Sequence, residues 1–148
     1  RILGMHIPEG EAMTLERCRE SMAEALVFFP RYHPEHPFVG FECMSWILNT
    51  QLADMLGSYS NLVKYQEELY LFPLPSSGTD GLYFVFDSAE VDPDNAPRDT
   101  TLRRAYLDHL RAGKRLRGGG MFFTKEDFTR FGTQHYRSQF AAAMALAG

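Results

Sequence analysis

Few cysteines and no long apolar run occur in this sequence, and each shortage excludes a class of protein. Cys18 and Cys43 are the only thiols in 148 residues, and they lack Cys-x-x-Cys spacing. A disulfide-rich secreted miniprotein is therefore excluded, and a cytoplasmic protein is expected, although two thiols still allow one disulfide. No segment approaches the ~18 consecutive apolar residues of a membrane-spanning helix, so no membrane partner is expected.

Positive charge is also scarce. The chain has 15 Lys and Arg against 19 Asp and Glu, which gives a formal net charge of −4. Because proteins that bind a phosphate backbone are usually basic, nucleic-acid binding is the weakest interpretation. It would rest on the cations of one stretch, Arg103, Arg104, Arg111, Lys114, Arg115 and Arg117.

What the sequence does contain is an ordinary globular composition, with 45% hydrophobic and 23% charged residues. A chain of this length buries roughly 70% of its unfolded surface, which is enough for one core. We expect one domain over residues 1–140 and an alanine-rich tail over 141–148. The chain begins Arg1-Ile2-Leu3-Gly4 without an initiator Met, which indicates a piece of a longer protein.

Hydrophobic spacing and turn residues predict an α/β (α+β) domain. Thr14 is a suitable N-cap, and the apolar spacing of three and four that follows predicts a helix that Pro30 ends. In chain order we expect a strand at 1–7, a helix at 14–29, a central strand at 38–48 covered on both faces, a short helix at 50–56, strands at 62–72 and 82–86 that form an antiparallel hairpin, a helix at 100–112, a strand at 121–123 and a last helix.

Two constellations of side chains suggest chemistry, but a structural interpretation is stronger for both. His33 and His36 have a metal-like spacing, yet they lie in a proline-rich loop without further ligands at suitable spacing, so no metal is expected. Cys43 could pair with His6 or His109 as a nucleophile. However, it lies within an apolar strand, where nothing lowers the pKa of a thiol, and a small core residue is the simpler interpretation.

Two glycine-containing segments suggest anion binding. The run Lys114–Gly120 combines three cations with three glycines, although a basic helix end beside a flexible turn is the simpler explanation. The segment Gly4–Ala12 passes from a strand through a glycine turn into a helix, the layout in which first-turn N–H groups bind phosphates. Glu9, Glu11 and Glu16 oppose a phosphate there, so an ordinary strand-to-helix turn stays open.

The element order and several runs of sequence together resemble the C-terminal GNAT-like domain of bacterial acyltransferases, in which another acyltransferase domain comes first. The likeness extends over residues 2–139. The runs that carry it are Gly4-Met5-His6-Ile7-Pro8-Glu9-Gly10, Cys43-Met44-Ser45-Trp46-Ile47-Leu48, Ser60-Asn61-Leu62-Val63-Lys64-Tyr65-Gln66, Pro97-Arg98-Asp99-Thr100-Thr101-Leu102-Arg103-Arg104-Ala105 and Gly118-Gly119-Gly120-Met121-Phe122.

The resemblance implies a GNAT-like mixed central sheet with flanking helices and a C-terminal β-hairpin, to which this chain adds a C-terminal helix and strand. It also implies acyl-CoA (acetyl-CoA or longer) as co-substrate. The pantetheine would lie between the splayed strands 1–7 and 38–48, and the pyrophosphate at the start of the intervening helix. The cofactor-binding residues that this implies are Met5, His6, Ile7, Gly10, Glu11 and Ala12.

By the same resemblance the activity would be acyl-CoA-dependent N-acyl transfer to an amine, with this chain as the C-terminal half of the enzyme. Transfer needs a base and an acid. The positions imply Glu42 or His6 as the base and Tyr59 as the acid. The implied partners are a small-molecule acyl donor, an amine acceptor and the N-terminal domain of the same protein.

One departure from the family pattern favours an alternative. Ile7 stands where GNAT enzymes have a basic or amide residue, and Pro8 has no backbone N–H. Both fit a non-catalytic GNAT-like module that binds a small ligand or a partner domain. An apolar edge exposed where a missing half would dock would also allow a homodimer.

Overall fold

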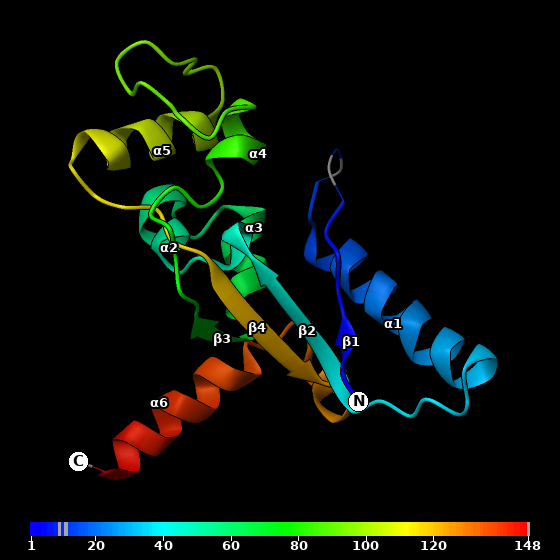
Figure 1. Ribbon diagram of the computed structural model, residues 1–148. Coiled ribbons are helices and arrows are strands. Elements are labelled where there is room, and N and C mark those ends of the chain that lie inside the picture. Colours follow the sequence, from blue (N-terminus) through cyan, green and yellow to red (C-terminus); the bar gives the residue numbers. More distant parts are fainter. Residues whose placement is uncertain (9, 11, 148) are drawn as a thin grey trace. The chain divides into compact units, whose positions relative to one another are not determined.

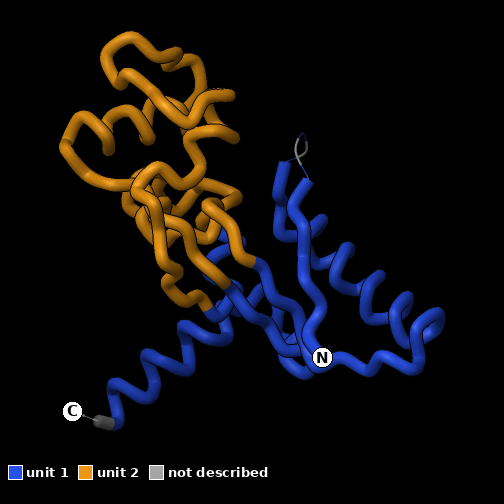
Figure 2. Tube along the Cα trace, viewed as in Figure 1, with its two compact units in different colours: residues 1–43, 64–70, 121–148 blue, residues 44–63, 71–120 orange. Residues whose placement is uncertain are grey.

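The computed structural model describes residues 1–8, 10 and 12–147, which fall into two compact units (Figures 1 and 2). Unit 1 comprises residues 1–43, 64–70 and 121–148, and unit 2 comprises residues 44–63 and 71–120. The chain therefore passes between the units four times. No helix among the described residues is long and apolar enough to cross a membrane.

Four strands form one mixed sheet in the order β1-β2-β4-β3. They are β1 (Leu3–Gly4), β2 (Gly40–Ser45), β3 (Tyr70–Pro73) and β4 (Gly119–Thr124). β1 and β2 are parallel, with Gly4 opposite Glu42. β4 runs opposite to β2 (Figure 1), and Lys125 N, just after β4, donates to Val39 O, just before β2, at 2.9 Å. The α/β class and the central position of β2 are thus confirmed.

Capping residues place the helix starts where the sequence predicts them. Thr14 Oγ1 accepts a hydrogen bond from Arg17 N, and Thr100 Oγ1 accepts one from Arg103 N. The helices are α1 (Leu15–Tyr32), α2 (Gln51–Leu56), α3 (Asn61–Glu67), α4 (Leu82–Phe86), α5 (Thr101–Arg111) and α6 (His135–Ala147), with 3₁₀ turns η1 (Trp46–Leu48) and η2 (Glu126–Arg130).

The predicted hairpin over residues 62–86 is wrong, because residues 62–67 and 82–86 are helical and only residues 70–72 of the first predicted strand are extended, in β3. In α3, the adjacent residues Tyr65 and Gln66 are both buried, which fits a helix but not an alternating strand. In α4, Leu82 and Val85 are buried three residues apart. β3 and β4 take the place of the hairpin, so the strand expected as an extra one lies inside the sheet.

α1 does not end at Pro30. The helix continues to Tyr32, and His33 N closes it by donating to Phe29 O at 2.8 Å. A proline removes only its own N–H, so the following residues can still complete the last turn. This prediction therefore misplaced the helix end.

β2 is shorter than predicted, and only one of its faces is covered. Phe41 and Cys43 are buried, whereas Met44 is 67% exposed and Glu42 is half-buried. The strand ends at Ser45, whose hydroxyl caps the 3₁₀ turn η1. The apolar residues of η1 made the strand look longer in the sequence.

Each unit has its own apolar core. The core of unit 1 includes Tyr65, where burial raises the pKa of the phenol. Its other buried apolar residues are Met22, Phe38, Phe41, Cys43, Leu69, Met121, Phe123 and Phe131. The core of unit 2 contains Leu52, Leu82, Val85, Tyr106 and Leu116.

Candidate functional site

The parallel pair of β1 and β2 is short, and β2 extends beyond it. The last recorded bond of the pair runs from Met5 N to Glu42 O at 2.8 Å. β2 nevertheless continues to Ser45. In the described part of the chain, the backbone groups of His6 and Ile7 have no recorded hydrogen-bond partner. These groups are thus available to a ligand.

The turn between β1 and α1 contains a glycine in a conformation that other residues rarely adopt. Gly10 has φ +103° and lies in open space, so a side chain there would be strained but would not clash. After it, Thr14 N donates to Ala12 O at 2.9 Å, and α1 begins at Leu15. Glu11 was also predicted to bind the cofactor, but it lies outside the described residues.

The structure places Glu42 beside the start of the predicted donor site. Its partner across the pair is Gly4, where an added Cβ would meet nothing within 4 Å. The half-buried Glu42 side chain therefore borders open space in unit 1. His6 follows Gly4 by two residues and is exposed. Tyr59 belongs to unit 2 and is 92% exposed.

Cys43 and the two loop histidines, His33 and His36, lie in different surroundings. Burial raises the pKa of the Cys43 thiol, which makes it a poor nucleophile. His33 and His36 are about half exposed and lie 3.8 and 3.6 Å from the Glu35 carboxylate. Among residues 1–8, 10 and 12–147, no group of three or more His, Cys, Asp or Glu could hold a metal ion.

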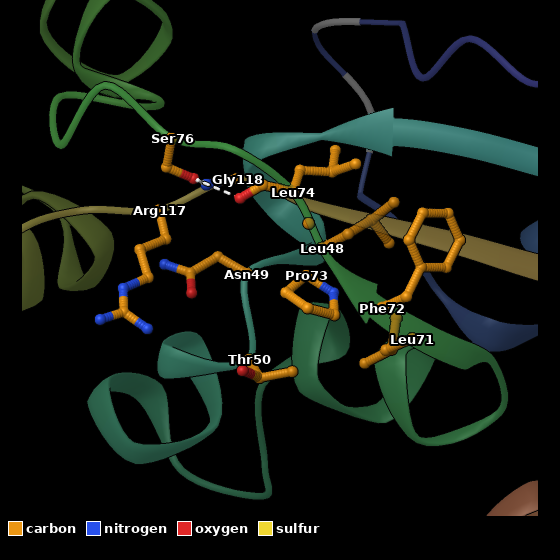
Figure 3. Close-up of a pocket in the computed structure, with 11 residues that line it drawn as sticks. Leu48, Asn49, Thr50, Leu71, Phe72, Pro73, Leu74, Ser76, Arg117 and Gly118 are labelled. Carbon is orange, nitrogen blue, oxygen red and sulfur yellow. Dashed lines mark hydrogen bonds between the residues drawn. The ribbon is translucent and has the colours of Figure 1, made fainter.

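Sequence reasoning missed a pocket of about 520 Å³ that lies entirely in unit 2 (Figure 3). Its walls come from the end of η1 and the residues after it, from β3 and its continuation, and from the start of β4. The signal was present in the run Lys114–Gly120, because Arg117, Gly118 and Gly119 all line the pocket. Gly118 N donates to Ser76 Oγ at 2.8 Å, which holds two walls together.

A polar cluster in unit 1 fastens the start of α6. Asp127 Oδ2 accepts hydrogen bonds from Thr124 Oγ1 at 2.7 Å and from Tyr136 Oη at 2.9 Å. The bond from Thr124, followed by that from Tyr136, holds the pKa of Asp127 below its usual range. In the same cluster, Asp127 N donates to Thr124 Oγ1 at 3.2 Å, and Thr124 N donates to Tyr136 Oη at 3.3 Å.

Comparison with known proteins finds one protein family and several similar acyltransferase structures. Residues 1–123 match the family described as GNAT-like C-terminal domain. One similar structure is an acyltransferase in complex with CoA and 10C-teicoplanin, with TM-score 0.75, 30% identity, and coverage of 83% of this chain and 40% of that one. Another is an acyltransferase with decanoyl-CoA and teicoplanin, with TM-score 0.75, 30% identity, and coverage of 82% and 40%.

A third similar structure is an acyltransferase mutant in complex with octanoyl-CoA, with TM-score 0.74, 30% identity, and coverage of 82% and 40%. This chain therefore spans about two fifths of the length of these solved proteins. Among curated protein sequences, none matches it.

Proposed function

The chain belongs to the GNAT-like C-terminal domain family, and on this basis we propose that it is the acyl-CoA-binding C-terminal part of an N-acyltransferase. The observation that carries the proposal is the β1–turn–α1 segment of unit 1. A parallel strand pair ends at Met5, a glycine turn follows, and a long helix begins at Leu15. The similar acyltransferases in complex with CoA, decanoyl-CoA or octanoyl-CoA support it.

We propose that the chain recognises the donor mainly through its backbone. The pantetheine arm carries amide groups, which can bond to the unpartnered backbone of His6 and Ile7. The pyrophosphate would lie at Gly10 and Ala12 before α1, where first-turn N–H groups and the helix dipole favour an anion. Met5 and Glu11 would complete the contacts.

For the transfer step we propose Glu42 or His6 as the base. The base takes a proton from the acceptor ammonium, and the amine nitrogen then attacks the thioester carbonyl carbon. The new C–N bond forms and the C–S bond breaks. The CoA thiolate takes a proton from an acid, for which we propose Tyr59, and the second proton that the nitrogen loses returns to the phenolate. Glu42 fits its role best because it is half-buried and borders open space beside Gly4.

The remaining partners also belong to the proposal. Because the chain spans about two fifths of the similar acyltransferases, we propose an N-terminal domain of the same protein as its partner, with a homodimer as the second choice. The acceptor is an amine. A cytoplasmic location fits the two free thiols of Cys18 and Cys43.

One observation favours the non-catalytic alternative. Ile7 offers no charge or side-chain donor to a pyrophosphate, and Pro8 offers no backbone N–H. A module of this kind would keep the fold but bind a different small ligand or a partner domain.

Thermal unfolding with and without acetyl-CoA or decanoyl-CoA separates the two functions. A ligand at 100 times its Kd adds about 2.7 kcal/mol of stability, which raises the midpoint by several degrees. The Gly10→Asp variant should lose this shift, because it places a strained, negatively charged side chain in the turn. Gly113→Ala, which replaces a glycine at φ +71° in unit 2, is the control and should keep it. The absence of a shift, both here and in a longer protein containing this chain, would favour the alternative.

A further inference from the structure

We propose that the pocket of unit 2 binds a second ligand, an apolar molecule that ends in one acidic oxygen group, either a carboxylate or a phosphate monoester. Every residue that lines the pocket belongs to unit 2, whereas the proposed donor site is built from the segment before α1 in unit 1. A volume of about 520 Å³ is within the range of small-molecule sites. The pocket therefore extends the function beyond acyl-CoA binding.

An apolar ligand body fits the pocket, because one of its sides is apolar. Leu71, Phe72 and Leu74 form this side, together with Leu48 from η1 (Figure 3). A Cβ on Gly120 would lie 2.3 Å from the Phe72 ring, so the ring packs directly against the backbone of β4. An aliphatic or aromatic group of the ligand would replace water against these side chains.

The acidic group is inferred from Arg117, an exposed arginine that lines the pocket. In the described part of unit 2, the arginines at 98, 103, 104, 111 and 115 all donate to carboxylate, carbonyl or hydroxyl oxygens of the protein. Arg117 has no recorded partner among the described residues, and it lines the pocket. It lies on the side of the pocket opposite Phe72 (Figure 3). A guanidinium binds planar oxyacid groups with two parallel hydrogen bonds.

Apart from Arg117, the polar side of the pocket carries uncharged groups whose positions are fixed by hydrogen bonds. Asn49 is 2% exposed, and its amide is held by Gln51 through bonds of 2.9 and 3.0 Å. No carboxylate is among the lining residues. Asp80, recorded beside Gly118, already accepts bonds from Ser77 Oγ and Gly78 N. An ammonium would therefore find no counter-charge in the lining, whereas an acid finds one.

The test compares three probes with the same chain length, octanoate, octanol and octylamine, by calorimetry on this chain. We expect octanoate to bind tightest. Arg117→Gln should weaken octanoate roughly tenfold, which corresponds to about 1.4 kcal/mol, and should leave octanol unchanged. Lys114→Gln is the matched control, because it removes the same charge from the same exposed run but does not line the pocket. Arg117→Glu should reverse the order, so that octylamine binds better than octanoate.

Two results would overturn the proposal. One is octanol binding the unchanged chain as tightly as octanoate. The other is equal weakening of octanoate by Arg117→Gln and Lys114→Gln, because the charge effect would then be unspecific. If neither occurs, a second pair of probes identifies the source of the acid. Phenylalanine, but not phenethylamine, should displace octanoate if the acid belongs to an amine acceptor. Neither should do so if the pocket holds a free acyl acid.

Acetyl-CoA is measured in parallel, so the two proposals can fail separately. We expect Arg117→Gln to keep the thermal shift with acetyl-CoA. If the variant loses that shift and octanoate does not bind the unchanged chain, Arg117 belongs to the donor site and the second ligand is refuted. If octanoate binds but acetyl-CoA gives no shift, either here or in a longer protein containing this chain, the acyltransferase proposal fails and this one stands.

Discussion

The two units offer a ligand different kinds of group. The turn before α1 in unit 1 offers backbone groups, through unpartnered residues, a glycine and a helix start. The pocket in unit 2 offers side chains, namely an apolar wall and a free arginine. A backbone site depends on conformation and tolerates most side-chain changes, whereas a side-chain site can change its ligand with one substitution. Within this chain, unit 2 is therefore where we expect specificity to be set.

The largest loss of stability should come from replacing glycines at which backbone segments approach closely. Both units contain such a glycine, so in this respect they should not differ. A Cβ on Gly40 in unit 1 would lie 2.5 Å from Phe123 O, and one on Gly119 in unit 2 would lie 2.2 Å from Leu48 O. Because backbone atoms cannot rotate away, either change to Ala should cost about 3 kcal/mol or prevent folding. Gly4→Ala, where nothing lies within 4 Å, is the control. Urea unfolding of Gly119→Ala that matches this control would contradict the prediction.

The next effect separates a fully buried carboxylate from a partly exposed one in unit 1, because the Glu67 side chain is 18% exposed. Glu68 is 3% exposed, and its Oε2 accepts bonds from Gly132 N at 2.7 Å and Gln134 N at 3.0 Å. Glu68→Ala leaves both N–H groups without their acceptor and should cost about 2–3 kcal/mol. The neighbouring Glu67, paired with the exposed Arg137, should cost under about 1 kcal/mol when replaced by Ala. Equal losses in chemical denaturation would show that burial is not the cause.

A pH titration should further separate the two units, because Asp127 lies in unit 1. Hydrogen bonds, first from Thr124, lower the folded-state pKa of Asp127. Its stabilisation is therefore complete above the unfolded pKa of about 3.9 and is lost as the pH falls through the lower folded value. Asp127→Asn should cost about 1–2 kcal/mol at pH 7 and flatten the acid limb of the stability curve. If the acid limb of the stability curve is unchanged in this variant, groups other than Asp127 cause the loss of stability at low pH.

The smallest effect should come from the surface ion pairs of unit 2. Arg111 bonds Asp94 at 3.0 Å, but the Asp94 side chain is 79% exposed. Water and salt screen such a pair, so Arg111→Ala should change the unfolding free energy by less than about 0.5 kcal/mol. A calorimetric loss above 1 kcal/mol would mean that the loop after α4 depends on this arginine.

Local signals predicted a good part of the fold. Thr14 and Thr100 marked helix starts because a hydroxyl acceptor satisfies a first-turn N–H. The segment 82–86, by contrast, is aromatic and apolar, a composition typical of strands. It is helical because Leu82 and Val85, three residues apart, pack into the unit 2 core, which depends on residues far away in sequence.

The candidate site was predictable only in part, for a similar reason. The turn at Gly10 was found because a glycine between a strand and a helix has a local pattern. The pocket was missed because Leu71–Leu74 and Arg117–Gly119 meet only after residues 75–116 have folded between them. The basic and glycine-rich run was noticed, but the sequence could not show which of its three cations lines the pocket.

The repeated passage of the chain between the units has a consequence for biosynthesis. Unit 1 uses residues 1–43, 64–70 and 121–148, so one of the two sheet neighbours of β2, the strand β4, is translated late. Residues 1–43 must wait, with Phe38 and Phe41 still uncovered, until the segment from Met121 has left the ribosome. Unit 2 needs nothing beyond Gly120. The nascent chain should therefore complete unit 2 before unit 1, and residues 1–43 should need protection from aggregation until then.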